Sequence, residues 1–291
     1  MKIAYITYSG VNNYSSANNF NENTDTLPFL QQEGLDIESA IWDDPTVNWS
    51  DFDFALLKCP WDYHQKFEAF NIWLNTLQRI GVKLLNDYQI VKWNADKHYL
   101  KEIAAAGMDV IPSVFLDRGW NGALTSIFEE LNADKIIIKP CVSGGSKNTF
   151  IVEREHYSEK TAEILTLLEE IDLIAQPFME QVREGEWSFL FFGGEYSHTI
   201  IKKPKTGDFR VQQIFGGTIE EVKPSAEQIQ KASAYISKFA PHSVYARVDG
   251  LLINGEFQLM ELELIEPFLY LAYDSDAVGR YAQAIKRSIG K

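Results

Sequence analysis

The stretch KIIIKPCVSGGSKNTFIVER, residues 135–154, places a glycine-rich turn between two strand-like segments. The isoleucines at 136–138 are typical of a buried strand, and TFIVER (149–154) returns directly after the turn as a second strand. Phosphate loops of the Walker type instead run from a strand through the loop into a helix. The sequence therefore predicts a β-hairpin with a flexible connection, and it excludes a Walker loop.

The small residues of this turn allow the backbone to approach a ligand closely and to point successive N–H groups at an anion. Lys139 at the strand end and Lys147 in the turn add positive charge. A flap over an anionic ligand is one interpretation. An ordinary solvated turn with incidental lysines is the other, and the turn alone does not decide between them.

Charge and composition exclude several classes of protein. The 291 residues include 41 acidic and 27 basic side chains, for a formal net charge of −14. This field repels a nucleic-acid backbone, so an anionic ligand is expected to be small and bound by local cations. There is no apolar run long enough for a membrane span, and the start MKIAYITYSG lacks the core of a secretory signal, which favours the cytoplasm. Two cysteines and five scattered histidines match no disulfide framework or metal spacing.

The first 90 residues alternate strand-like and helical patterns. Such alternation predicts a parallel sheet, whose ligands lie beyond the carboxyl ends of the strands. The expected strands are 2–7, 37–42, 54–59 and 82–86, with helices near 27–32 and 68–81.

The rest of the chain predicts antiparallel strands joined by short turns. Segments 172–179, 186–194, 195–203 and 209–215 alternate in this way. A further hairpin over 243–264 turns at Asn254-Gly255, which is a strong local turn signal.

Three carboxylates interrupt the apolar residues of this last hairpin. Alternate residues share one face of a strand, so Glu261 and Glu263 project together, and counting from the turn places Asp249 near the same level. Buried carboxylates are costly unless they bind cations. Oxygen ligands of this kind suit Mg²⁺. A solvent-facing edge with charges for solubility is the alternative.

Together these segments resemble the ATP-grasp superfamily of carboxylate–amine ligases over residues 85 to 290, and most closely its glutathione synthetase and ribosomal-protein glutamate ligase branch. The resemblance rests on order: a lysine in WNADKHYL, a second in IIIKP, the small-residue flap, the QPFM connector, GEWS, KKPKTGDFR and the acidic hairpin. It implies an α/β fold with two lobes enclosing a nucleotide. The expected domains are an N-terminal α/β domain (1–90), a central lobe with the flap (91–178) and a C-terminal lobe with the metal-binding hairpin (179–291).

The resemblance also implies a role for each matching residue, with ATP and two Mg²⁺ ions as cofactors. Phosphate contacts fall to Lys97 and Lys139, and the flap is Ser143, Gly144, Gly145 and Ser146. The adenine is expected near Gln176, Pro177, Phe178 and Met179, and the ribose at Glu186. The metal ligands are Asp249, Glu261 and Glu263, the last replacing a frequent asparagine, and the catalytic cations are Arg210, Lys202 and Arg247.

The segment LLKCPWDYHQKF (56–67) is the candidate substrate region. It presents Lys58, Trp61, Asp62 and Tyr63 where a strand ends. A similar Trp-Asp-Tyr segment, usually after an arginine, marks the subgroup of ATP-grasp proteins that includes a ligase-like enzyme of cycloserine biosynthesis. Lysine replaces that arginine here and lacks its two-pronged geometry for a carboxylate. Packing against the next domain is the alternative for Trp61 and Tyr63.

The function expected from this resemblance is ATP-dependent ligation of a small, amino-acid-like carboxylate to an amine, within one molecule or between two. A substrate carboxylate attacks the γ-phosphate, and an amine then displaces phosphate from the acyl-phosphate. A small-molecule kinase and a non-catalytic nucleotide-binding module are the alternatives. No nucleic-acid or membrane partner is expected, and a homodimer stays open.

Overall fold

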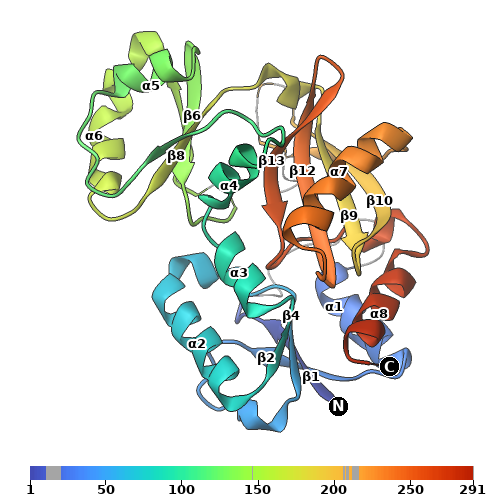
Figure 1. Cartoon of the computed structure of the whole chain (residues 1–291). Helices are drawn as coiled ribbons and strands as arrows, with labels where there is room; N and C mark the ends of the chain where they lie inside the picture. Colours follow the sequence, from blue (N-terminus) through green and yellow to red (C-terminus); the bar gives the residue numbers. More distant parts are fainter. Residues whose placement is uncertain (11–20, 146, 206, 208–209, 212–215, 291) are drawn as a thin grey trace.

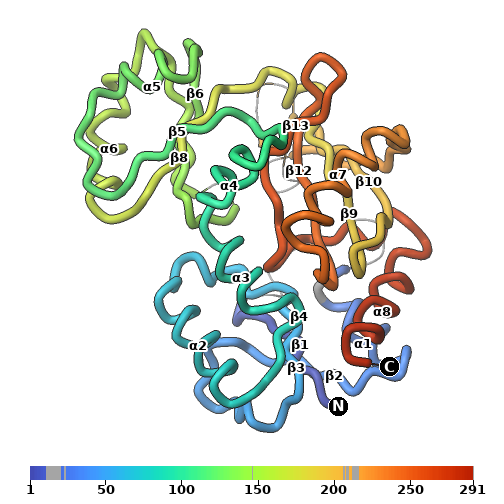
Figure 2. The backbone as a smooth tube through the Cα atoms, viewed as in Figure 1, coloured from blue at the N-terminus to red at the C-terminus, as the bar shows by residue number. Residues whose placement is uncertain are grey.

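The computed structural model describes residues 1–10, 21–145, 147–205, 207, 210–211 and 216–290. Within them it contains three β-sheets with helices packed on their faces (Figures 1 and 2). They are named here the N-terminal, central and C-terminal sheets. None of the helices in this described part is long and apolar enough to cross a membrane.

The N-terminal sheet is parallel throughout, as predicted, with the strand order β2-β1-β3-β4. Helix α2 (Phe67–Ile80) buries one apolar stripe against it and ends at Gly81, whose φ of 87° is the left-handed conformation that glycine adopts without strain. The other elements are β1 (Lys2–Thr7), α1 (Glu22–Gln32), β2 (Asp36–Ile41), β3 (Phe54–Leu57) and β4 (Lys83–Leu85).

The central sheet is antiparallel, with the order β5-β8-β6-β7. Its strands are β5 (Val114–Leu116), β6 (Lys135–Pro140), β7 (Phe150–Glu153) and β8 (Leu173–Pro177), and its helices are α5 (Leu124–Glu130) and α6 (Ser158–Leu168). Ile138 of β6 lies opposite Phe150 of β7, so the predicted hairpin across the glycine-rich turn is confirmed.

The C-terminal sheet is also antiparallel, with the order β11-β10-β9-β12-β13. Its strands are β9 (Glu186–Phe192), β10 (Glu195–Lys203), β11 (Thr218–Glu221), β12 (Tyr245–Ile253) and β13 (Glu256–Glu263). Helices α7 (Ala226–Phe239) and α8 (Ala277–Ser288) accompany it, and α3 (Tyr88–Asn94) and α4 (Tyr99–Ala105) connect the N-terminal sheet to the central one (Figure 1).

Two expectations about these strands change. Placing 172–179 in one sheet with the strands that follow is wrong, because β8 pairs with β5 and β6 of the central sheet. Leu173 and Ala175 of β8 pack with Ile136 and Ile138 in a separate apolar core, and residues 178–185 carry the chain into the next sheet. Of the strand expected at 209–215, residues 209 and 212–215 lie outside the described residues, and the outer strand is β11.

The N-terminal and C-terminal sheets share one apolar core. Tyr5 and Leu56 of the first pack in the same cluster as Phe192 of the second and Tyr281 of α8. Because α8 returns the end of the chain onto α1, the two sheets are joined by packing as well as by sequence (Figure 2).

Candidate functional site

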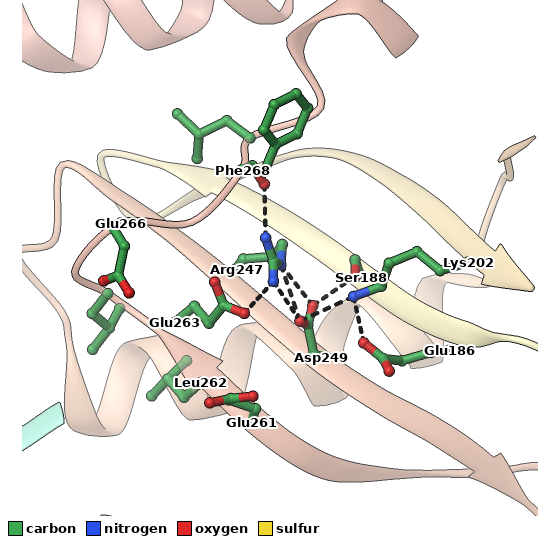
Figure 3. A network of polar contacts seen from close by, with 12 residues as sticks. Glu186, Ser188, Lys202, Arg247, Asp249, Glu261, Leu262, Glu263, Glu266 and Phe268 are labelled. Carbon is green, nitrogen blue, oxygen red and sulfur yellow. Dashed lines mark hydrogen bonds and ion pairs between the residues drawn. The ribbon is translucent and has the colours of Figure 1, made fainter. Parts of the chain in front are cut away.

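The hairpin β12–β13 carries the three predicted metal-binding carboxylates. Asn254 and Gly255 both have positive φ, and from this turn the pairs run from Ile253–Glu256 to Gly250–Leu259. The register then shifts, so that Asp249 lies opposite Glu261. A one-residue slip moves a strand's side chains to its other face. The bulge at Met260 therefore turns Glu261 and Glu263 onto the face that carries Asp249 (Figure 3).

Backbone and side-chain contacts from residues 94–111 hold the outer edge of β13. At the bulge, Leu259 donates its N–H to the Asp109 carbonyl at 3.0 Å and accepts from Ile111 N–H at 2.9 Å. Beyond it, the N–H groups of Leu262 and Leu264 donate to Tyr99 Oη at 2.8 Å and to Asn94 Oδ1 at 2.9 Å. Sequence reasoning singled out only Lys97 in WNADKHYL; Asn94 and Tyr99 of the same motif fix the strand that faces it.

Lys97 connects the flap to the acidic hairpin. Its Nζ lies 3.0 Å from Glu261 Oε1 and donates to Ser143 Oγ at 3.2 Å, while its backbone N–H donates to the Cys141 carbonyl at 3.1 Å. Burial acts to lower the pKa of Lys97, but Glu261 outweighs it and the pKa is raised. The ammonium is therefore held protonated between the two elements.

Lys139, near the end of β6, differs from Lys97 in having no ion-pair partner among the described residues. Its side chain is half-buried. Burial lowers its pKa, with Glu261 opposing and Lys97 adding to the effect. This ammonium is desolvated without a fixed counter-ion, which suits it to a bound anion.

Asp249 accepts more hydrogen bonds from cationic and hydroxyl side chains than Glu261 or Glu263 does (Figure 3). Arg247 Nε and Nη2 donate to it at 2.9–3.0 Å, Ser188 Oγ at 2.6 Å and Lys202 Nζ at 3.2 Å. Burial would raise the pKa of Asp249, but Arg247 and Lys202 outweigh it and lower that pKa to about 2. Lys202 also pairs with Glu186 at the start of β9.

Glu263 shares the Arg247 guanidinium with Asp249. The pKa of Glu263 is raised to about 7. Burial is the main cause, Asp249 and Glu261 add to it, and together they outweigh the opposing effect of Arg247. Three carboxylates on one face, with a guanidinium and two lysines already divided among them, form an oxygen-rich and electron-rich set. Such a donor set fits Mg²⁺, a hard cation that takes oxygen ligands.

The end of β8 and the connector that follows it contain the four residues expected near the adenine. Gln176 lies opposite Ile137 and donates to Ser113 Oγ at 3.0 Å, and Pro177 ends the strand. Phe178 donates its N–H to the Lys135 carbonyl at 2.9 Å, and Lys135 Nζ lies 4.5 Å from the centre of its ring. Met179 begins the short turn that leads to β9. Of the remaining predicted residues, Arg210 is partly buried and lies in the segment that connects β10 to β11, and Ser146 lies outside the described residues.

Three of the four candidate substrate residues make internal contacts instead. Lys58 is 1% exposed and lies 2.5 Å from Oε1 of Glu22, which also accepts the backbone N–H groups of Leu269 and Leu271. Asp62 accepts from Trp42 Nε1 at 2.8 Å and pairs with Lys66. Tyr63 is buried among the aromatic residues of α2. No sequence signal marked Glu22, because it follows an asparagine-rich stretch without periodicity.

Trp61 differs, because it reaches the segment that follows the C-terminal sheet. Its indole N–H donates to the backbone carbonyl of Glu266 at 3.0 Å, just beyond the end of β13. The N-terminal sheet thus contributes a contact at the edge of the carboxylate group, where the predicted ligand crevice at the carboxyl ends of its strands is expected.

Comparisons with known proteins match both halves of this arrangement. Residues 3–86 match a family model described as the N-terminal domain of D-cycloserine synthetase DcsG, and residues 120–257 match the ATP-grasp domain of prokaryotic glutathione synthetase. The chain is an ATP-grasp protein related to D-cycloserine synthetase and to prokaryotic glutathione synthetase. The resemblance drawn from its motifs is therefore confirmed, and so is the α/β ATP-grasp fold class.

Individual relatives agree with this placement. The cycloserine biosynthesis protein DcsG of Streptomyces lavendulae is 29% identical over 269 residues, covering 87% of this chain and 88% of the relative. A glutathione synthetase of Prochlorococcus marinus subsp. pastoris is 24% identical over 53% of this chain and 48% of its own length. The crystal structure of D-cycloserine synthetase DcsG superposes with a TM-score of 0.85 at 25% identity, covering 99% of this chain and all of the other.

A more distant structure shares the fold. D-alanine–D-alanine ligase from Bacillus anthracis, complexed with ATP, has a TM-score of 0.71 at 17% identity over the whole of this chain and 96% of its own.

The ATP-grasp flap lies against the N-terminal sheet through His64. A Cβ atom placed on Gly144 lies 3.0 Å from Nδ1 and Cε1 of the His64 ring, which is closer than ordinary packing permits. Burial, together with Lys147 and Lys97, lowers the pKa of His64, so this ring packs as a neutral group.

Replacing Gly144 by valine is expected to lower kcat about 10-fold, because the side chain collides with His64 and stiffens a loop that must move. Steady-state kinetics with ATP as the varied substrate measure the effect. The double variant His64→Ala/Gly144→Val separates the two causes, since it removes the collision and keeps the stiffer backbone. An unchanged rate in Gly144→Val would make the loop a bystander.

Proposed function

We propose that this chain is an ATP- and Mg²⁺-dependent ligase that joins a small, amino-acid-like carboxylate to an amine through an acyl-phosphate. The observation that carries the proposal is the Lys97 bridge. One ammonium lies within hydrogen-bond distance of both the flap residue Ser143 and the metal-face carboxylate Glu261. A phosphate that displaces this ion pair is bound by Lys97 and leaves Glu261 available for a divalent cation.

The phosphate contacts follow from the two lysines. Lys139 has no fixed counter-ion among the described residues, and Lys97 has one that a ligand can replace. We assign both lysines to binding of the α- and β-phosphates, and Ser143, Gly144 and Gly145 to covering the β- and γ-phosphates. The adenine is assigned to Gln176, Pro177, Phe178 and Met179, and the ribose to Glu186. The proposed domains are residues 1–90, 91–178 and 179–291.

Asp249, Glu261 and Glu263 are the residues that would hold Mg²⁺, which supplies charge neutralisation at the transferred phosphoryl oxygens. Arg247 and Lys202 orient this face, because between them they form four ion pairs with Asp249, Glu263 and Glu186. We therefore give both a positioning role, and Arg210 the contact with the transferred phosphoryl group.

The reaction needs no protein nucleophile. A carboxylate oxygen of the substrate attacks the γ-phosphorus and ADP leaves, which forms the acyl-phosphate. The amine nitrogen then attacks the acyl carbon, the C–N bond forms, the C–O bond to phosphate breaks, and the amine loses a proton. The protein contributes proximity and charge neutralisation. Because relatives are named for cycloserine synthesis, closure of one amino-acid-like molecule on itself is included with ligation of two.

Calorimetry of the purified protein with ATP tests the nucleotide site. Binding is expected with Mg²⁺ present, and it is expected to weaken at least about 10-fold when Mg²⁺ is replaced by EDTA, because the carboxylate face then repels the phosphates. Absence of ATP binding in Mg²⁺ contradicts the proposal.

Hydroxylamine separates ligase from kinase. With ATP and a panel of amino acids and small carboxylates, an acyl-phosphate yields a hydroxamate, whereas a kinase that makes a phosphate ester releases ADP without one. ATP binding with no ADP formed in any pairing identifies a non-catalytic nucleotide-binding module.

A further inference from the structure

In the part of the chain that the structure describes, one carboxylate beside the proposed metal face has no partner. Each of the others is ion-paired: Glu261 with Lys97, Glu263 with Arg247, and Asp249 with Arg247 and Lys202. Among the described residues, no hydrogen bond or ion pair reaches the carboxylate of Glu266, which Figure 3 shows beside Glu263. Sequence reasoning assigned no role to this residue.

The surroundings of Glu266 disfavour a negative charge unless a cation is added. Burial raises its pKa well above the usual range, Glu263 and Glu261 add to the effect, and the opposing cations Lys97 and Arg247 are already committed to other carboxylates. The side chain still has access to solvent, so its oxygens can meet a ligand. A carboxylate in this position is satisfied by a positively charged donor.

The position of Glu266 is fixed from the N-terminal sheet. Trp61 donates its indole N–H to the Glu266 backbone carbonyl at 3.0 Å, and the Trp61 ring lies 6.2 Å from the ring of Tyr8 at the end of β1. The electron-rich faces of aromatic rings attract ammonium groups. The residue that anchors Glu266 is thus aromatic, a type of side chain whose ring face attracts a cation rather than an anion.

Figure 3 shows the Glu266 side chain beside Glu263, next to the proposed position of the reacting group. Glu266 follows Glu263 by three residues, and in an α-amino acid the ammonium nitrogen is separated from the carboxyl carbon by a single carbon atom. A substrate whose carboxylate is activated at the metal face therefore has its amino group close by. We infer that Glu266 binds the ammonium group of the carboxylate substrate, so that the enzyme selects α-amino acids over acids that lack the amino group.

This inference rests on the proposed ligase function, and the variant Glu266→Gln tests it. Glutamine keeps the shape and removes the charge. Phosphate release is measured with ATP, Mg²⁺ and hydroxylamine for a panel of free D- and L-amino acids, each beside its 2-hydroxy and its deaminated counterpart. The matched control is Glu256→Gln, at the exposed start of β13.

Wild-type protein and Glu256→Gln are expected to prefer the amino acid of a pair by at least about 30-fold in kcat/KM. Glu266→Gln is expected to lower kcat/KM for that amino acid about 30-fold, and to change the Kd of ATP and kcat/KM for the deaminated acid by less than about 3-fold. Its thermal midpoint is expected to match or exceed that of the wild type, because glutamine replaces a carboxyl group whose charged form the surroundings disfavour.

The inference is overturned by an equal loss for both members of a pair, by an unchanged preference in Glu266→Gln, or by a wild-type protein that uses no amino acid better than its deaminated counterpart. These outcomes leave ATP binding and hydroxamate formation intact and so leave the ligase standing. Loss of ATP binding in the wild type removes the proposed function itself, and the inference with it.

Discussion

Replacing Glu261 by alanine is expected to lower kcat/KM by at least about 1,000-fold, which corresponds to about 4 kcal/mol. The loss arises because Glu261 is the carboxylate opposite Asp249 on the proposed metal face and the partner of Lys97. Steady-state kinetics over a range of Mg²⁺ concentrations measure it, and high Mg²⁺ is expected to restore only part of the rate.

A second variant separates metal loss from damage to the fold. Alanine leaves the Lys97 ammonium with Ser143 as its remaining described side-chain acceptor, whereas Glu261→Gln keeps an oxygen acceptor in place and removes only the charge. Glu261→Gln is expected to unfold at the wild-type temperature and to lose activity almost as fully. Glu256→Ala, on the same strand, serves as the control. A full rate with Mg²⁺ in Glu261→Gln would refute the metal assignment.

Replacing Lys139 by methionine is expected to lower kcat/KM for ATP about 300-fold. Methionine keeps the length and apolar stem of the side chain but removes a site cation that no described carboxylate neutralises. The fold is expected to be as stable as the wild type or more so, because burial already disfavours this charge. Calorimetry of ATP binding and thermal unfolding, measured together, distinguish lost binding from lost structure.

Lys160→Met is the matched control for this change. Lys160 lies on α6 of the same lobe and pairs only with the exposed Glu163 among the described residues. Its loss is expected to leave ATP binding unchanged. Equal ATP affinity in Lys139→Met and Lys160→Met would show that Lys139 is not a phosphate ligand.

The elements that were predicted well depend on contacts between near neighbours in the chain. The hairpin of 135–154 follows from two β-rich segments around a glycine turn, and Asn254-Gly255 forms the second hairpin because both residues accept positive φ at little cost. Helix α2 shows its apolar stripe and its glycine stop in the sequence itself. Such features are encoded by short-range sterics and periodicity, so a single sequence suffices to predict them.

The membership of strands in sheets was harder to predict. β8 alternates like the strands that follow it, yet it pairs with β6, which ends 33 residues before β8 begins. Its partner is selected by packing with Ile136 and Ile138, and no local pattern records that choice.

The candidate site also has one part that the sequence predicts and another that only the structure shows. The order of Lys97, Lys139, the flap and the acidic hairpin is visible in the sequence, because each lies in its own short motif. Lys58 was expected to face a ligand, and the structure pairs it with Glu22 in the interior; Trp61 of the same segment instead anchors the backbone of Glu266. These partners are separated by 36 and 205 residues.

The sequence alone determined the residue types available for chemistry, the two hairpins and the parallel N-terminal sheet, since periodicity and turn chemistry are local properties. Only the tertiary structure decided that Glu261 faces Asp249. A regular hairpin from Asn254-Gly255 pairs Asp249 with Met260 and points Glu261 to the other face; the bulge reverses this, and it is held by Asp109 and Ile111 about 150 residues away. Register is set by the contacts that a strand makes along its whole length, and these contacts exist only after the chain has folded.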